Sequence, residues 1–170
     1  MRPLSENEIR ACFVNCSKGE ARRLNLPRGF DQLPWDDLDF LGWRDQGAPD
    51  RGYLVAEHRG ELVGITLRVP SVRRSLRMSN VCSLCICTHA GSGVALLAAR
   101  RAGAAGREGN TVGTYVCADL ACSLYLRGLK KSALVSRPEE SLSVEEQVAR
   151  MTGNLDAFLA KVLTDSAAAA

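Results

Sequence analysis

Four cysteines have the residue type and the spacing of metal ligands. They occur as two close pairs, Cys82 with Cys85 and Cys117 with Cys122. Two such pairs can surround one Zn²⁺ ion with four thiolate sulfurs, a closed tetrahedral arrangement that leaves no position for a substrate or a water molecule. The spacing therefore predicts one structural zinc ion and directs the search for function toward a binding surface. Reduced, packed thiols are one alternative, and a redox dithiol is a weaker one because the surrounding βαβ pattern is missing.

The chain has seven cysteines, and three of them are not assigned to the metal. Cys87 and His89 follow Cys85 closely enough to replace a ligand or to begin a second site, but no further ligands stand nearby to complete one. We expect Cys87 to be a packed thiol or to support the ligands, and His89 to lie in a loop. Cys12 and Cys16 are expected on one face of an N-terminal helix, as small apolar residues.

The elements that must position the four ligands can be predicted from the segment between the pairs. Residues 94–100 and 111–117 are apolar runs joined by a glycine-rich connection, which favours an antiparallel hairpin, although the alanine-rich first run also has helical propensity. Asp119 is expected to cap a short helix that contains Cys122 and ends before Gly128. A cysteine turn, a hairpin and a helix whose first turn supplies the last ligand describe a treble-clef zinc finger.

The N-terminal segment is predicted to be one helix and an irregular stretch. Ser5 and Glu8 form a capping-box pattern ahead of a helix over about residues 6–17. Residues 30–49 lack a regular pattern. Three aromatic residues there are expected to pin this stretch to the core: Trp35, Phe40 and Trp43.

Two further elements flank the cysteine segment. Residues 53–58 and 62–69 are β-rich and predict a second antiparallel hairpin. Ser143 and Glu146 form a capping box at the start of a long C-terminal helix with one apolar stripe. We expect that stripe to pack on the zinc module, with a partner helix or a dimer contact as the alternative.

These elements predict an α+β protein, with a treble-clef finger in a small antiparallel β module flanked by terminal helices. We expect residues 1–49 to form the N-terminal helix and irregular segment. Residues 50–163 are expected to form the zinc-finger domain, and residues 164–170 a disordered tail.

The length and composition of the chain limit the kind of protein and the cellular location that we expect. With 170 residues, 46% of them hydrophobic, the chain can form one domain with a real core. No stretch approaches the roughly 20 apolar residues that span a bilayer, and the first residues lack the apolar core of a signal peptide. We therefore expect a soluble cytoplasmic protein with no membrane partner, whose cysteines favour metal over disulfides.

The net charge of +3 is distributed unevenly. Residues 59–131 contain eleven Lys or Arg and three Asp or Glu, a local charge of +8, whereas the remainder of the chain carries −5. This asymmetry favours an acidic protein surface or a phosphate backbone as the partner, with a solvated basic face as the alternative. Aromatic residues make up 5% of the chain, which provides little material for stacking on single-stranded nucleic acid.

Catalysis has little support in the sequence. His58 lies at a hairpin turn, where we expect it to be solvated, and no base accompanies the acidic cluster of Asp36, Asp37 and Asp39. The glycine-rich connection lacks the lysine and hydroxyl residue of a phosphate-binding loop. We expect a protein that is not an enzyme and has no small-molecule substrate.

The cysteine motifs in their context resemble a known family. The segments 81–85, 113–123 and 143–146 together resemble the C-terminal treble-clef zinc-finger domain of the elongation factor G-binding family, the fusidic-acid-resistance type, over roughly residues 50–163. Residues 13–20 resemble short bacterial members of the same family. The resemblance implies a four-cysteine zinc site and a non-enzymatic protein that binds a translation factor, elongation factor G first among them, and modulates its interaction with the ribosome.

Charge and position suggest a partner-binding surface on the treble clef. The predicted contact residues are Leu84, Arg100, Arg101, Arg107, Tyr115, Arg127, Lys130 and Lys131. Two departures from the family pattern are a shorter N-terminal part and Leu84 at a position that is aromatic in the resistance members. The alternative function is binding of RNA, including ribosomal RNA, through the basic face. A regulatory zinc domain that senses thiol oxidation through Cys87 is a third reading.

Overall fold

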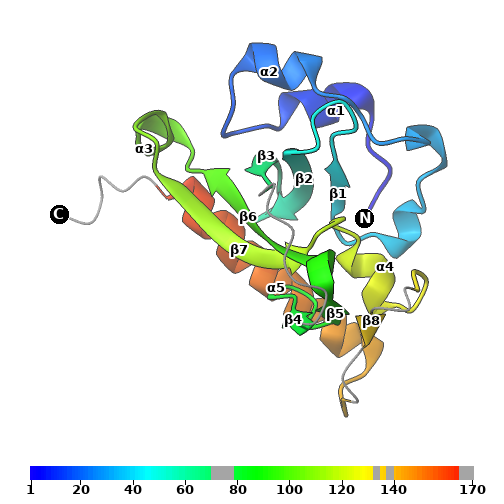
Figure 1. Ribbon diagram of the computed structural model, residues 1–170. Coiled ribbons are helices and arrows are strands. Elements are labelled where there is room, and N and C mark those ends of the chain that lie inside the picture. Colours follow the sequence, from blue (N-terminus) through cyan, green and yellow to red (C-terminus); the bar gives the residue numbers. More distant parts are fainter. Residues whose placement is uncertain (70–78, 132–134, 137–139, 165–170) are drawn as a thin grey trace.

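A five-stranded antiparallel sheet organises the computed structural model, which describes residues 1–69, 79–131, 135–136 and 140–164 (Figure 1). The strand order is β1-β2-β3-β6-β7. These strands are β1 (Leu41–Arg44), β2 (Arg51–His58), β3 (Glu61–Arg68), β6 (Val94–Arg100) and β7 (Thr111–Cys117). A three-stranded sheet of order β4-β5-β8 lies beside the cysteines and consists of β4 (Ser79–Val81), β5 (Thr88–Ala90) and β8 (Val135–Ser136).

Both predicted hairpins are confirmed. In the β2–β3 hairpin His58 pairs with Glu61, and the two turn residues Arg59 and Gly60 have φ angles of 52° and 82°. Two left-handed residues in a two-residue turn match the right-handed twist of the flanking strands. In the β6–β7 hairpin the pairing runs without a break from Val94 opposite Cys117 to Arg100 opposite Thr111.

The connection between β6 and β7 contains a short helix, α3 (Gly103–Arg107), where the sequence predicted only a flexible turn. Gly106 in this helix touches the preceding backbone. A Cβ atom at Gly106 would lie 1.7 Å from the carbonyl oxygen of Arg101, so no larger residue fits here without moving the chain. The glycines of this connection thus permit close packing of the backbone as well as a change of direction.

The predicted N-terminal helix is shorter than expected. α1 (Glu6–Ala11) has the expected capping box between Ser5 and Glu8, but it ends at Cys12. The chain then pairs with β3, since Gly64 N–H donates to Cys12 O and Val14 N–H donates to Gly64 O, both at 2.9 Å. The prediction that Cys12 and Cys16 share a helix face is therefore wrong, because hydrogen bonds to the sheet replace the next helical turn.

A second helix follows, α2 (Lys18–Arg23), with its own capping box between Ser17 and Glu20. The segment 30–49, predicted to be irregular, contains the 3₁₀ turns η1 (Phe30–Gln32) and η2 (Trp35–Asp37) as well as β1. The four-residue strand β1 was missed because it is too short to show a pattern of alternation. Phe40 and Trp43 are buried at 1% and 5% exposure, as expected for residues that anchor this segment.

The C-terminal helix α5 (Val144–Leu163) begins at the predicted capping box of Ser143 and Glu146 and covers one face of the sheet (Figure 1). Its buried residues follow the predicted apolar stripe and join the core of the zinc module: Met151, Leu155, Phe158, Leu159 and Val162. On the other face, Ile9 of α1 and Leu24, which follows α2, pack with Trp43, Tyr53 and Val55 in a second cluster of buried residues. The stripe therefore packs within the chain, as expected.

Some expectations fall on residues that the structure does not describe. The predicted tail, apart from Thr164, lies outside the described residues, and so do three arginines of the basic segment 59–131: Arg73, Arg74 and Arg77. The boundary between residues 1–49 and 50–163 stays a prediction. None of the helices in the described part of the chain has the length and apolar composition needed to cross a bilayer.

Candidate metal centre

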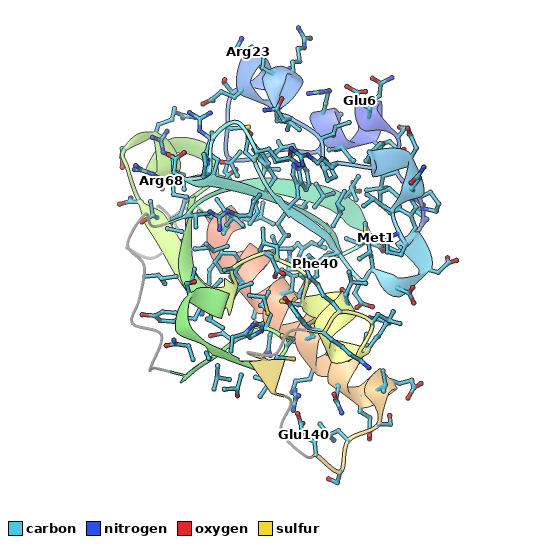
Figure 2. The ribbon with its side chains drawn as sticks, turned by 45° about the vertical axis from the view of Figure 1, so that its right-hand side comes forward. Met1, Glu6, Arg23, Phe40, Arg68 and Glu140 are labelled. Carbon is cyan, nitrogen blue, oxygen red and sulfur yellow. The ribbon has the colours of Figure 1, made fainter. Side chains whose placement is uncertain are left out.

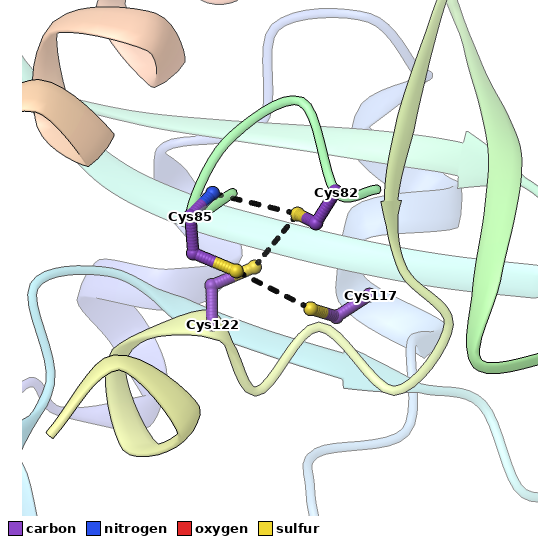
Figure 3. Close-up of side chains that lie close together, drawn as sticks. All are labelled: Cys82, Cys85, Cys117 and Cys122. Carbon is purple, nitrogen blue, oxygen red and sulfur yellow. Dashed lines mark hydrogen bonds between the residues drawn. The ribbon is translucent and has the colours of Figure 1, made fainter. Parts of the chain in front are cut away.

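The four predicted ligands lie together in the interior (Figure 3). Cys82 and Cys85 belong to the turn after β4, Cys117 ends β7, and Cys122 begins the helix α4 (Cys122–Leu126). All four sulfurs lie within 4.8 Å of one another, with 3.7 Å from Cys82 Sγ to Cys122 Sγ and 3.5 Å from Cys85 Sγ to Cys117 Sγ. Four sulfurs about 2.3 Å from one zinc ion would be about 3.8 Å apart, so this cluster fits the metal.

Two tight turns bring each pair of cysteines to one point. In the first turn, the N–H of Ile86 donates to Cys82 O at 3.0 Å, and in the second, the N–H of Leu120 donates to Cys117 O at 2.8 Å. Ile86 and Leu120 both have left-handed backbones, with φ of 62° and 60°. Such a conformation costs on the order of 1–3 kcal/mol for a non-glycine residue, and it persists only where the surroundings impose it. Closure of the cysteine cluster is the constraint that both turns share.

The cysteine cluster is almost completely enclosed. Each of its four residues is exposed by 4% or less. Hydrogen bonds with the other three thiols, together with burial, raise the pKa of Cys122 well above its usual value. A bound Zn²⁺ ion would supply the positive charge that allows buried thiols to ionise together. Its chemistry here is structural, because four sulfurs fill its coordination shell.

A histidine contacts the cluster from outside. His89, expected in a loop, lies in β5 at 3% exposure, and its Nε2 is 3.2 Å from Cys117 Sγ. Burial lowers the pKa of His89, which favours a neutral ring. With Cys117 as a zinc-bound thiolate, which can only accept, the tautomer that carries its proton on Nε2 would donate to the sulfur. The ring also meets Tyr125 edge-on, with 4.9 Å between the centroids.

The same side of the cluster is braced by Asp119. Tyr125 Oη donates to Asp119 Oδ2 at 2.9 Å, and Lys130 Nζ lies 2.8 Å from that oxygen. The predicted cap of α4 is therefore corrected: Ala121 occupies the N-cap position, and Asp119 instead accepts the N–H of Ala121 at 3.2 Å. Asp119 thereby ties the segment between Cys117 and Cys122 to α4 and to Lys130.

We expect the change His89→Ala to lower zinc affinity about 10- to 100-fold, the usual effect of removing an outer hydrogen bond to a ligand. Competition with a chelating dye measures this directly. The matched control is His58→Ala, the other histidine of the chain, whose ring contacts α5 rather than the cluster. An unchanged affinity in His89→Ala, or an equal loss in His58→Ala, would contradict the role given to His89.

His58 itself differs from its prediction. It was expected to be solvated at the hairpin turn, but it is 6% exposed and its Nδ1 pairs with Asp156 of α5. The helix packs over the end of β2 and removes the ring from water. The spacing of the sequence contains no signal for this contact, because the two residues are far apart in the chain.

Leu84, predicted to contact a partner, is buried. It is 2% exposed, and its carbonyl oxygen accepts the side-chain N–H of Asn154 on α5 at 3.1 Å. The cysteine turn therefore faces α5, and Leu84 fills the core instead of the surface. Cys87 is likewise buried, at 2%, and lies outside the four-sulfur group found among the described residues.

Three of the predicted basic contact residues make internal bonds. Arg101 Nη1 donates to two carbonyl oxygens at the end of α5, at 2.8 and 3.1 Å. Arg127 forms a two-pronged ion pair with Asp39 at 2.6 and 2.8 Å, and Lys130 pairs with Asp119. These side chains fasten α5, the N-terminal segment and α4 to the rest of the fold.

The other predicted contact residues are exposed: Arg100, Arg107, Tyr115 and Lys131. Tyr115 lies directly opposite Leu96 in the β6–β7 pairing, and these two apolar side chains are 37% and 42% exposed. Leu96 was not among the residues predicted from charge and position. The sequence signal for the exposure of Leu96 is the alternation along β6, because Leu97 is buried and Leu96 therefore points to the other face of the sheet.

A buried four-cysteine cluster built from a turn, a hairpin and the first turn of a helix defines a treble-clef zinc-finger protein. The chain belongs to the family described as the FBP C-terminal treble-clef zinc-finger, which matches residues 8–162. The fold is also similar to the solved structure of the fusidic acid resistance protein FusC, with a TM-score of 0.53 and 17% identity. That similarity covers 84% of this chain and 53% of FusC, so the chain corresponds to about half of that protein. No curated protein sequence matches the chain.

Proposed function

We propose that this chain acts by binding a translation factor, elongation factor G in the first instance, and modulates the interaction of that factor with the ribosome without catalysing a reaction. Its family membership and its fold, which is shared with a fusidic acid resistance protein, support this reading. The closed metal cluster also supports it, because a zinc ion with four sulfur ligands serves to hold the fold.

The observation that carries the proposal is the exposed apolar pair of the β6–β7 hairpin. Leu96 and Tyr115 stand side by side on one face, and Arg100, further along the same face of β6, is exposed. Arg107 of α3 adds a positive charge near the end of the hairpin. We call these four residues the hairpin face. An apolar centre with a basic rim fits a protein partner with an acidic surface.

The metal cluster supports the hairpin face from one end. The backbone oxygen of Tyr115 accepts the N–H of Ser83, which lies between Cys82 and Cys85 in the chain, at 2.7 Å. The strand β7 itself ends in the ligand Cys117. Gly113 lies beside the pair, and a Cβ atom there would lie 3.0 Å from Leu96 Cδ1. The zinc site thus holds in place the strand that presents Tyr115, which reduces the entropy lost when a partner binds.

Binding of elongation factor G tests the proposal. We expect Tyr115→Ala and Leu96→Ala each to weaken binding of purified elongation factor G about 10-fold or more, as measured by calorimetry, because central apolar residues carry most of the energy of an interface. Val144→Ala is the matched control, since Val144 is 41% exposed at the start of α5, and it should bind normally. No binding by the zinc-loaded protein, or an equal loss in the control, would reject the proposal.

RNA binding through the basic segment remains the alternative. The local charge of +8 favours it, whereas the internal pairing of Arg127 and Lys130 reduces the positive charge offered to a phosphate backbone. Affinity that falls steeply and linearly with log salt, together with loss of the partner on nuclease treatment, would favour RNA. A response to Tyr115→Ala with a shallow salt dependence would favour the protein partner.

A further inference from the structure

A polar cleft of about 570 Å³ lies between α2 and the central sheet, on the face opposite α5. Tyr53, Thr66 and Ala98 contribute to its lining from β2, β3 and β6. Leu24, at the end of α2, lies on the helical side. This volume is within the range of about 300–1,000 Å³ that is usual for small-molecule sites.

Four arginines from four different elements line this cleft: Arg23 at the end of α2, Arg51 at the start of β2, Arg68 at the end of β3 and Arg100 at the end of β6. All four are exposed to solvent. Arg23 and Arg68 are labelled in Figure 2, where both lie on the same side of the molecule. Because α2, β2, β3 and β6 are separate in sequence, the fold alone gathers these charges.

The strand pairing places the positive charges side by side. Arg51 lies directly opposite Arg68 in the β2–β3 register, and Arg68 lies opposite Ala98, two residues before Arg100 on the same face of β6. Like charges directly opposite on neighbouring strands destabilise a sheet. An anion between them would convert this repulsion into attraction.

The acidic residues of the cleft offset only part of this charge. Asp45 is buried, and its carboxylate is occupied by Asn25, by the hydroxyl of Tyr53 and by backbone N–H groups. Glu20 accepts the hydroxyl and the N–H of Ser17 as part of the α2 cap. Asp50 is exposed at the cleft.

The charge of the arginines reaches into the cleft. Hydrogen bonds from Ser17 lower the pKa of Glu20, and the charges of Arg100 and Arg51 lower it further. Glu20, in the first turn of α2, lines the cleft together with Arg51 and Arg100. Arg23 and Arg68 line the same cleft.

We propose that this arginine cleft binds a small phosphate-bearing molecule of about the size of a nucleotide. A phosphate group offers several anionic oxygens, and the planar guanidinium group pairs with two of them at once. Guanidinium groups on three neighbouring strand ends and one helix can contact one phosphate or diphosphate together. The proposal does not depend on a translation-factor partner, although Arg100 belongs to both the arginine cleft and the hairpin face.

Titration of the zinc-loaded full chain with inorganic pyrophosphate in low-salt buffer tests the proposal. We expect saturable binding at one site by calorimetry, and about a 10-fold or greater loss of affinity in Arg23→Gln and in Arg51→Gln, because each removes a charge-assisted hydrogen bond. The matched control is Arg22→Gln, the adjacent residue of α2, which is exposed but does not line the cleft. Because these arginines are exposed, neither variant should melt below the wild type, and Arg51→Gln, which removes the repulsion from Arg68, should melt at the same temperature or slightly higher.

Three results would overturn the proposal: no saturable binding of pyrophosphate, an equal loss of affinity in Arg22→Gln, or tighter binding of the tricarboxylate citrate. A further outcome would show that the small-molecule assignment is wrong. In that outcome pyrophosphate does not bind, an RNA oligonucleotide does, and both Arg23→Gln and Arg51→Gln abolish the RNA binding. These measurements use the chain without any partner. Failure here therefore leaves the test with elongation factor G unaffected, and failure of that test leaves this one intact.

Discussion

Replacing Cys117 with serine is expected to abolish zinc binding and to unfold the region around β6, β7 and α4. Cys117 ends β7, and its sulfur lies 3.5 Å from that of Cys85, so one substitution opens the cluster and releases two elements from each other. Structural zinc contributes on the order of 10–16 kcal/mol in zinc-finger peptides. Typical domains have a net stability of only about 5–15 kcal/mol, so the loss is large enough to unfold the module.

Two measurements test this expectation. Elemental mass spectrometry gives the zinc content per chain, and circular dichroism gives the secondary structure. Cys12→Ala is the matched control, because Cys12 follows α1 and its Sγ contacts the carbonyl oxygen of Ile9 at 3.2 Å, away from the cluster. That variant should keep one zinc ion per chain. If Cys117→Ser retained one zinc ion with normal secondary structure, the assignment of the metal centre would be incorrect.

The change Leu159→Ala is expected to lower the free energy of unfolding by about 2–5 kcal/mol, the usual cost of removing a buried leucine side chain from a core. Leu159 is 0% exposed and belongs to the same core cluster as Leu84 and the cysteines. A cavity here would loosen α5 from the zinc module. Asn154, which bonds to the carbonyl of Leu84, and Asp156, which pairs with His58, belong to the same helix.

Urea unfolding followed by circular dichroism measures this effect as a shift of the transition midpoint. Leu129→Ala is the matched control, since it removes the same atoms from a side chain that is 59% exposed. It should change the free energy of unfolding by about 0.5 kcal/mol or less. Equal midpoints for Leu159→Ala and Leu129→Ala would show that α5 does not contribute to the stability of the core.

Several features of the fold could be predicted because their signals are local. The capping boxes at Ser5 and Ser143 satisfy backbone groups within one helical turn, and the Arg59-Gly60 turn fits a two-residue hairpin whatever surrounds it. The capping box of Ser17 and Glu20 is an equally local signal, and it lies where the predicted first helix was expected to end. Such hydrogen bonds join residues three or four positions apart, so the sequence alone contains both partners.

The four metal ligands were also predictable, for a chemical reason. Few residue types bind zinc, and each turn needs its two cysteines close together in sequence, so the pairs carry their own signal. The groups that enclose the metal site could not be predicted from the sequence. His89 reaches Cys117 only because β5 lies beside the cluster, and Tyr125 packs on its ring only through the course of α4.

The surface was the part that sequence reasoning described least well. Arg101 and Arg127, predicted to contact a partner, form bonds within the chain, and Leu84 is buried. Leu96, which charge and position did not select, is exposed. The exposure of a side chain depends on which other elements cover it. Leu84 is buried in the core cluster that includes residues of α5, and Asn154 of that helix bonds to its carbonyl oxygen.

The sequence by itself therefore determined the metal ligands, both hairpins, and the starts of the first and last helices. The tertiary structure decided which charges pair internally, which apolar side chains remain outside, and that four arginines from separate elements line one cleft. The physical reason is the distance along the chain between the residues that interact. Turns, caps and paired ligands are fixed by neighbours a few residues away, whereas burial and the gathering of charge depend on strand pairing and helix packing between distant parts of the chain.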